Sequence, residues 1–249
     1  MNRGKFVIAS LAARTLSVFR STDEPRHGTR VMMYHDINES GVIEDIYSIP
    51  VKAFSRGVAG LAEWAGIKHH SFVPFASRPE PGIAITFDDG YRSTLFLAAP
   101  VFEKFEIPFH VFVTKSFVEQ GNPSYLSKSD VVALSRMPLA TLGVHGVSHR
   151  HFSQLNETSL RKELLESRDW LEQLTGQPVT TLSYPHGDFT PAISNIVGQC
   201  GFDAAACSAV GTFTQSAQSL VIPRIDIWSH DTPSTTIAKV RGKWDTLLP

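Results

Sequence analysis

The sequence predicts a single-domain α/β fold in which parallel strands curl into a barrel. Short, almost wholly apolar runs alternate along the chain with longer segments of helical periodicity, as expected for parallel strands covered by helices. The chain has 249 residues, a usual length for one barrel of alternating strands and helices. No internal repeat or Pro/Gly-rich linker divides it. We therefore expect one barrel domain.

Strands are predicted where apolar and β-branched residues run with little interruption. The runs at 82–87 and 109–113 are almost entirely apolar, which favours burial on both faces. In chain order the seven predicted strands are 30–35, 82–87, 109–113, 142–144, 180–184, 203–207 and 221–227.

The helix predicted at 157–174 has the clearest boundaries. Its leucines form one stripe, with charged residues on the opposite face. Either Asn156 or Thr158 can cap its start, and Gly176 stands where a helix commonly stops.

Three further helices are predicted between the strands. One begins with Thr190 as its N-cap and Pro191 at its first helical position. The others are 53–65 and 94–105, and we expect Pro100 to kink the second.

Composition excludes some classes of function. The chain has 23 Lys and Arg against 24 Asp and Glu, so no net field favours nucleic acid. A hydrophobic fraction of 42% is ordinary for a soluble globular enzyme. Cys200 and Cys207 predict buried free thiols rather than a cysteine-based zinc site, although a disulfide between them stays open.

Residues 1–28 are predicted to be an extension before the domain at 29–249. Within it, residues 2–20 place basic residues before a short apolar stretch, which is too short for a membrane span of ~20 residues. We expect either a plain surface segment or an amphipathic helix in peripheral contact with a membrane. The expected location is cytoplasmic or membrane-associated, with export left open.

Chemically capable side chains recur where the predicted strands end. In α/β barrels the catalytic groups come from the C-terminal ends of the strands. The residues at these ends are His35, Asp88, Asp89, His145 and the segment 184–186.

The first motif is the TFDDG sequence at 86–90. Successive residues of an extended segment point to different sides, so Asp88 and Asp89 can have separate tasks. One carboxylate can bind a cation while the other accepts a proton from water. A solvated turn is the alternative, because Asp-Asp-Gly is also common in turns.

The second motif is His145-x-x-x-His149. Two histidines four residues apart can face one way on a helical turn and bind one metal ion. Gly146 occupies the place of the glutamate found in H-E-x-x-H proteases, so the base has to come from elsewhere, and Asp88 is the obvious supplier. Ordinary surface histidines are the alternative.

Two more segments complete the pattern. The turn at 184–187 can present backbone N–H groups to an oxyanion, or it can be a plain turn between strand and helix. Arg224 lies in an apolar run and needs a carboxylate partner. We expect Asp88 to be that partner, with Asp226 as the alternative.

The order of these motifs resembles the polysaccharide deacetylase family, also called the NodB-homology or carbohydrate esterase family 4 fold. The resemblance runs from about residue 31 to residue 231 and implies a distorted seven-stranded NodB-type barrel. The segments that carry it are Met-Tyr-His at 33–35, TFDDG at 86–90, H-x-x-x-H at 145–149, YPxG at 184–187 and PRI at 223–225.

The resemblance implies a divalent metal, most often Zn²⁺, bound by Asp89, His145 and His149. It also implies that Asp88 is the general base. The implied substrate is an N-acetylated sugar within a polysaccharide, oligosaccharide or glycoconjugate, and sometimes an O-acetyl ester.

The chain departs from the family pattern at three places. Ser183 stands where the family often carries an arginine that contacts the base, so Arg224 is expected to substitute. His186 replaces the usual aromatic residue within the oxyanion and substrate turn formed by Tyr184, His186 and Gly187. The acid motif is not clear, and His230 is the nearest candidate for the general acid.

Two alternative functions stay open at this point. One is an amide hydrolase of the same fold acting on small cyclic amides. The other is a sugar-binding relative that has lost catalysis.

Overall fold

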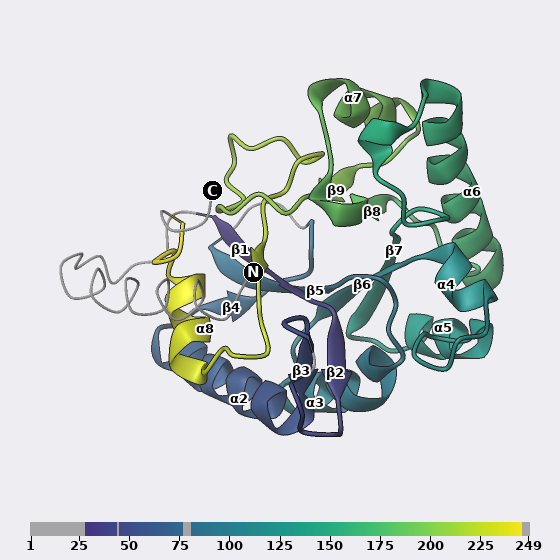
Figure 1. The fold of residues 1–249 in the computed structure, drawn as a ribbon. Helices are drawn as coiled ribbons and strands as arrows, with labels where there is room; N and C mark the ends of the chain where they lie inside the picture. The colour runs from purple at the N-terminus through teal and green to yellow at the C-terminus, as the bar shows by residue number, and fades with distance from the viewer. Residues whose placement is uncertain (1–27, 44, 77–80, 246–249) are drawn as a thin grey trace.

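The structure is a computed structural model that describes residues 28–43, 45–76 and 81–245 (Figure 1). The predicted N-terminal extension, including residues 2–20, lies outside the described residues. Among the helices that are described, none is both long and apolar enough to cross a membrane.

One parallel sheet organises the molecule. Its strands follow the order β10-β1-β5-β6-β7-β8-β9, with β4 paired to β5 outside this path. A separate parallel pair is formed by β2 and β3. The strands are β1 (Thr29–Tyr34), β2 (Asp36–Asn38), β3 (Ser48–Pro50), β4 (Ser71–Phe72), β5 (Gly82–Phe87), β6 (Phe109–Val113), β7 (Ala140–Val144), β8 (Thr181–Ser183), β9 (Ala204–Ala206) and β10 (Ile225–Asp226).

The segment before β10 brings the two ends of this strand order together. Ile222 donates its N–H to Ala205 of β9 and accepts from the N–H of Cys207. Three residues later, Ile225 pairs with Met32 of β1. The sheet therefore curls into a distorted barrel, which confirms the predicted fold class, and its main path contains seven strands.

The strand predicted at 221–227 is much shorter in the structure. Only Ile225–Asp226 forms a strand, because the segment changes neighbours from β9 to β1 along its length. Pro223 has no N–H to donate at that point, so a regular ladder cannot continue through it.

Helices cover the outside of the sheet (Figure 1). The helices are α2 (Val51–Ile67), α3 (Ala99–Phe105), α4 (Lys115–Glu119), α5 (Lys128–Ser135), α6 (Glu157–Thr175), α7 (Pro191–Gln199) and α8 (Pro233–Val240). Short helical turns are η1 (Thr94–Ala98), η2 (Phe152–Gln154) and η3 (Pro185–Gly187). Of the two proposed caps for α6, Asn156 accepts from Ser159 N, and Thr190 caps α7 as predicted.

The predicted helix at 94–105 is divided in two. Its first turn, η1, is a π-helix, and α3 follows with Pro100 in its first turn. Pro100 therefore starts a new α-helix after a change of helix type, in keeping with its missing N–H.

Apolar side chains fill the space between the strands and these helices. Tyr34, Phe54, Phe87 and Phe102 form a chain of ring contacts that joins β1 and β5 to α2 and α3. Cys200 and Cys207 are both buried free thiols, as predicted. This packing leaves the C-terminal ends of β1, β5, β7 and β8 to place polar side chains beside one another.

Candidate metal and catalytic site

Asp89, His145 and His149 converge at the ends of β5 and β7. One potential ligand atom of each residue lies within 4.8 Å of the others. Oδ1 of Asp89 is 3.4 Å from Nε2 of His145 and 3.1 Å from Nε2 of His149. The residues proposed from the sequence as metal ligands therefore form one cluster.

The backbone around this cluster is turned sharply. Asp89 has φ 70° and Gly90 has φ 81°, so the chain reverses directly after β5. His149 also has a left-handed φ of 56°. The expected helical turn between His145 and His149 is wrong, because residues 145–150 form an irregular loop. The two rings meet through loop geometry, with centroids 4.9 Å apart.

The orientation of His145 is fixed by a hydrogen bond on the side away from Asp89. Nδ1 of His145 lies 2.8 Å from the carbonyl oxygen of Ser183 at the end of β8. A carbonyl in this position selects the tautomer with a proton on Nδ1 and leaves the lone pair of Nε2 for a metal.

Asp88 is held on the opposite side of the same strand end. Arg224 donates from Nη1 to Oδ1 and from Nη2 to Oδ2 of Asp88, both at 2.7 Å. The hydroxyl of Ser183 also donates to Oδ2 at 3.0 Å. Asp88 is thus the carboxylate partner predicted for Arg224, and all three side chains are buried.

Charge at the site favours ionised carboxylates and neutral imidazole. Burial alone would raise the pKa of Asp88, but Arg224 and His145 hold that pKa well below its usual range. Burial would also raise the pKa of Asp89, but the approach of His149 and the nearby histidine charges keep the pKa low. Burial lowers the pKa of His145 to about 4, although Asp88 and Asp89 oppose this shift.

This donor set fits a divalent metal. Oδ1 of Asp89 is buried and has no hydrogen bond of normal geometry among the described residues. The Nε2 atoms of His145 and His149 face it. One carboxylate oxygen and two imidazole nitrogens are ligands that zinc commonly takes at catalytic sites.

The predicted oxyanion turn needs correction at two of its three residues. Tyr184 is buried, its hydroxyl donates to the carbonyl of Leu220, and its N–H donates to Ala206. The N–H of Gly187 donates to the carbonyl of Tyr184. Both N–H groups are therefore engaged within the protein and are not available to a substrate.

His186 is the residue of this turn that faces outward. It is exposed, with a left-handed φ of 59°, and its ring lies 4.4 Å from that of His149. Its Nε2 lies 3.1 Å from the carbonyl oxygen of His149. The turn therefore places the His186 side chain beside the proposed metal ligand His149.

His35 is a site residue to which sequence reasoning gave no role. It directly follows β1, the strand next to β5, and its buried Nδ1 has no hydrogen-bond partner among the described residues. Burial raises the pKa of the nearby Asp226, in contrast to the lowered pKa values of Asp88 and Asp89. The position of His35 at a strand end and its place in the Met-Tyr-His segment at 33–35 were the signals in the sequence.

His230 lies in the turn between β10 and α8. The preceding residue, Ser229, donates its N–H to the carbonyl of Ile46, so this turn packs beside the β2–β3 connection. The following residue, Asp231, forms a buried ion pair with Lys239. The role of His230 as general acid stays a prediction.

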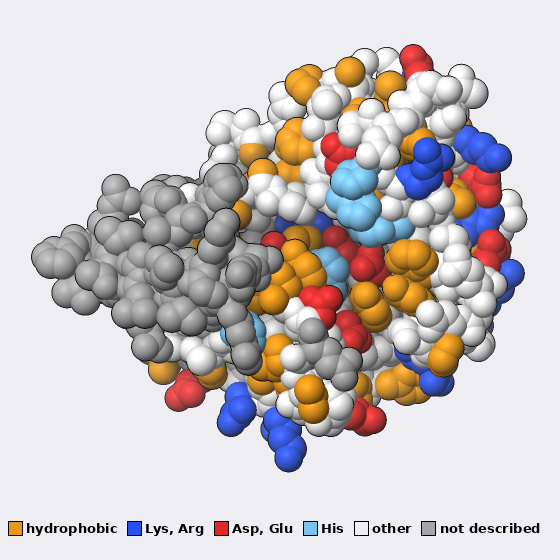
Figure 2. All heavy atoms as spheres, in the orientation of Figure 1, with side chains coloured by type: hydrophobic (Ala, Val, Ile, Leu, Met, Phe, Trp, Pro, Cys, Tyr) orange, Lys and Arg blue, Asp and Glu red, His pale blue; other side chains and the backbone are white. Residues whose placement is uncertain are grey.

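Aromatic side chains border the metal ligands. The ring of Phe117 lies 5.4 Å from that of His149 and 4.5 Å from that of Tyr125, which contacts Tyr91. Figure 2 shows the corresponding surface, where histidine and acidic side chains gather in a hollow beside hydrophobic ones. A hollow with polar groups at its base and aromatic sides suits a sugar ring.

Sequence comparisons lead to the same family as the motifs. Residues 76–205, slightly more than half of the chain, match the family described as polysaccharide deacetylase. A Bacillus subtilis (strain 168) protein described as a polysaccharide deacetylase, YxkH, is 20% identical over 206 residues, which cover 79% of this chain and 70% of YxkH.

Solved structures share the fold. The Streptococcus pyogenes deacetylase PplD, determined in complex with acetate, superposes with a TM-score of 0.75 at 17% identity, covering 86% of this chain and 98% of PplD. IcaB from Ammonifex degensii superposes with a TM-score of 0.71 at 23% identity, covering 90% of this chain and 100% of IcaB. Motif order, fold and family match agree, and the chain belongs to the polysaccharide deacetylase family as a carbohydrate deacetylase.

Proposed function

We propose that this protein removes acetyl groups from N-acetylated sugars of a polysaccharide or glycoconjugate, with Zn²⁺ held by Asp89, His145 and His149. The observation that carries the proposal is the convergence of these three ligand atoms within 4.8 Å, beside the buried Asp88. Three protein ligands leave a position for water or substrate, which is typical of catalytic rather than structural zinc.

A metal ion at this site would polarise the acetyl carbonyl and lower the pKa of a water molecule. Asp88 accepts the proton of the attacking water at a carboxylate oxygen. Arg224 and Ser183 keep that carboxylate ionised and correctly oriented. We assign the backbone N–H of His186, in the turn beside His149, as a donor to the oxyanion that develops on the acetyl oxygen.

The leaving sugar amine needs a proton from a general acid. The sequence suggests His230 for this task, and the structure offers His35 as a second candidate. His35 is favoured because it directly follows β1, the strand that pairs with β5, and its buried Nδ1 has no hydrogen-bond partner among the described residues. Amide cleavage requires a proton donor within reach of the leaving nitrogen.

Replacing each histidine with glutamine distinguishes these two candidates. We expect His35→Gln to lower kcat on an N-acetylated oligosaccharide by about a hundredfold, the lower end of the range for general acid catalysis. On an activated aryl acetate, whose leaving group needs no proton, His35→Gln should lose far less activity than on the oligosaccharide. We expect His230→Gln to retain near-wild-type activity on both substrates, and the reverse pattern would assign the acid to His230.

Acetate release from N-acetylated oligosaccharides tests the function itself. We expect release to stop when a chelator removes the metal and to return when Zn²⁺ is added back. Small cyclic amides, assayed in parallel, should not be hydrolysed. Hydrolysis of the cyclic amides alone would show that the protein is an amide hydrolase of a different class. Sugar binding without acetate release, in protein shown to contain zinc, would identify a non-catalytic relative.

A further inference from the structure

The loop between the two histidine ligands is held by a carboxylate outside the cluster. Glu163 of α6 accepts through Oε2 from the N–H of Val147 at 2.7 Å and from the N–H of Ser148 at 3.0 Å. Its Oε1 accepts from the hydroxyl of Ser148 at 2.5 Å. One carboxylate thus accepts three hydrogen bonds from two consecutive residues that lie between His145 and His149.

The opposite edge of this loop is bound by the first turn of α4. The N–H of Lys115 donates to the carbonyl of Gly146 at 3.2 Å, and the N–H of Ser116 donates to the carbonyl of Val147 at 2.9 Å. These donors have no partner inside their own helix, as is usual for the first turn. The loop is therefore fixed between α4 and Glu163.

The loop needs such support because its backbone cannot stabilise itself. Gly146 and His149 both have a left-handed φ, and residues 145–150 belong to no helix or strand. For a residue other than glycine this conformation costs free energy that its surroundings have to offset. Without Glu163, the N–H groups of Val147 and Ser148 would lose their acceptor.

Position 146 requires a glycine because the Glu163 carboxylate lies close to its backbone. A Cβ atom at position 146 would lie 3.1 Å from Oε2 of Glu163, closer than nine in ten real contacts of a Cβ atom. The place that a side chain would take is thus occupied by the carboxylate oxygen.

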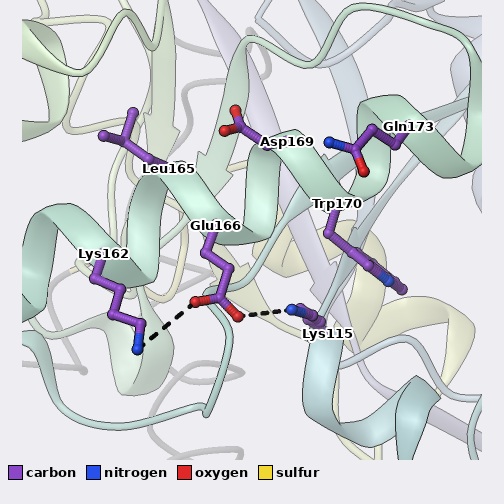
Figure 3. A pocket seen from close by; sticks show the side chains of 7 residues that line it. All are labelled: Lys115, Lys162, Leu165, Glu166, Asp169, Trp170 and Gln173. Carbon is purple, nitrogen blue, oxygen red and sulfur yellow. Dashed lines mark hydrogen bonds and ion pairs between the residues drawn. The ribbon is translucent and has the colours of Figure 1, made fainter.

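The neighbouring carboxylate on α6 makes a different kind of contact. Glu166 forms an ion pair with the ammonium group of Lys115 at 2.6 Å (Figure 3). A groove of about 410 Å³, also lined by Trp170 and Gln173, opens beside this pair. Glu166 is 37% exposed, and such surface pairs contribute little to stability.

We propose that Glu163 is a positioning residue for the metal site, which fixes His149 relative to His145 before the metal binds. This inference rests on the proposed metal-binding role of Asp89, His145 and His149. The three hydrogen bonds that the Glu163 carboxylate accepts come from residues 147 and 148, so Glu163 acts through the loop between the two histidines. Groups that orient metal ligands in this way change metal affinity by about 10- to 100-fold when they are replaced.

Glu163→Gln tests this role with little change of shape. Glutamine retains one acceptor oxygen but places an NH₂ group where the second oxygen was, so it cannot accept all three hydrogen bonds. Glu166→Gln is the matched control, because it makes the same chemical change one turn further along the same helix. His145→Ala serves as the reference for loss of a metal ligand.

The measurements are made on metal-free protein that is then titrated with Zn²⁺ in competition with a chelator. We expect Glu163→Gln to raise the Kd for Zn²⁺ by about 10- to 100-fold. Glu166→Gln should change this Kd by less than about twofold, as befits an exposed pair. The visible absorption of the Co²⁺-loaded protein should also change in Glu163→Gln, because a displaced His149 alters the ligand geometry.

Melting of the metal-free proteins separates positioning from general stability. We expect metal-free Glu163→Gln to fold cooperatively and to gain less Tm on addition of Zn²⁺ than the wild type. If Glu163→Gln does not fold, Ser148→Ala removes only the hydroxyl bond, and we then expect a smaller increase in Kd with an intact fold.

The outcomes distinguish this inference from the proposed function. If Glu163→Gln and Ser148→Ala bind Zn²⁺ with wild-type Kd while His145→Ala does not, Glu163 has no positioning role and the metal site stands. If His145→Ala also binds with wild-type Kd, the metal site itself is assigned wrongly. An increase in Kd that is equal for Glu163→Gln and Glu166→Gln would also overturn the inference.

Discussion

Asp88→Asn is expected to retain the metal and to lower kcat by about 10²- to 10⁴-fold, the usual contribution of a general base. The substitution removes the oxygen charge that accepts the proton while preserving side-chain shape. Asp89, His145 and His149, the proposed metal ligands, come together without Asp88, so we expect the Zn²⁺ content to stay unchanged. Turnover of an N-acetylated oligosaccharide and zinc content measured on the same preparation check this expectation.

The pH profile adds a second criterion for the role of Asp88. Arg224 and His145 hold the pKa of Asp88 far below neutral despite its burial. Asp88 is therefore a carboxylate throughout the neutral range, and its titration should not appear in the rate profile there. Asp226→Asn is a control that removes a neighbouring carboxylate from outside the cluster. Near-wild-type turnover in Asp88→Asn would show that another group is the base.

Arg224→Met is expected to reduce the free energy of unfolding by about 3–5 kcal/mol. Arg224 is completely buried and makes two hydrogen bonds of 2.7 Å to the carboxylate of Asp88. Removal of the guanidinium leaves a buried negative charge without its compensating partner. Methionine roughly preserves the apolar volume of the arginine stem, so the loss reports on the guanidinium, that is, on its charge and on its hydrogen bonds to Asp88, Thr86, Ser183 and Cys207. Denaturant unfolding near pH 7 measures it.

The sign of the pH dependence follows from the pKa of Asp88. In the wild type this pKa is depressed, so the stabilisation is complete above the unfolded value of about 4 and is lost as the pH falls through the folded value. In Arg224→Met, burial instead raises the pKa, so lowering the pH protonates Asp88 and relieves the destabilisation. The difference in free energy of unfolding between the wild type and Arg224→Met should therefore shrink as the pH falls from about 7 to about 4.5.

A double variant controls for effects that have nothing to do with the ion pair. Asp88→Asn removes the stranded charge, so it should recover much of the stability that Arg224→Met loses. If the double variant lost as much free energy of unfolding as the two single variants together, the buried charge of Asp88 would not be the cause. A loss in Arg224→Met that does not vary with pH would also contradict this explanation. Zinc is removed from all samples, because binding to the folded state would otherwise contribute to the measured stability.

Local sequence was sufficient to predict the boundaries of a strand or helix where one chemical pattern dominates the segment. The strand predicted at 82–87 matches β5 to the residue, because a run of apolar side chains buried on both faces has few alternatives. Asn156 and Gly176 bound α6 through local hydrogen bonding and a left-handed C-cap. Helices α4, α5 and α8 were not predicted, because 5 to 8 residues are too few for a convincing periodicity.

Side-chain roles at the site were predicted less evenly. Motif order was enough to bring Asp89, His145 and His149 together as candidates. Tyr184 was placed near the substrate because its motif suggested it, but burial and the bond to Leu220 exclude it from contact. No spacing rule reveals that a tyrosine beside a site points into the core.

The sequence by itself therefore determined the α/β barrel and the identity of the residues at its strand ends. Only the tertiary structure decided how these residues meet. Arg224 binds Asp88, which is 136 residues earlier in the chain. Glu163 of α6 binds the loop that precedes this helix. The curl of the sheet brings β10 beside β1 and so allows Arg224 to bind Asp88. The packing of α6 against the loop allows Glu163 to bind the loop. Such contacts depend on long-range packing, which local propensity and motif spacing do not encode.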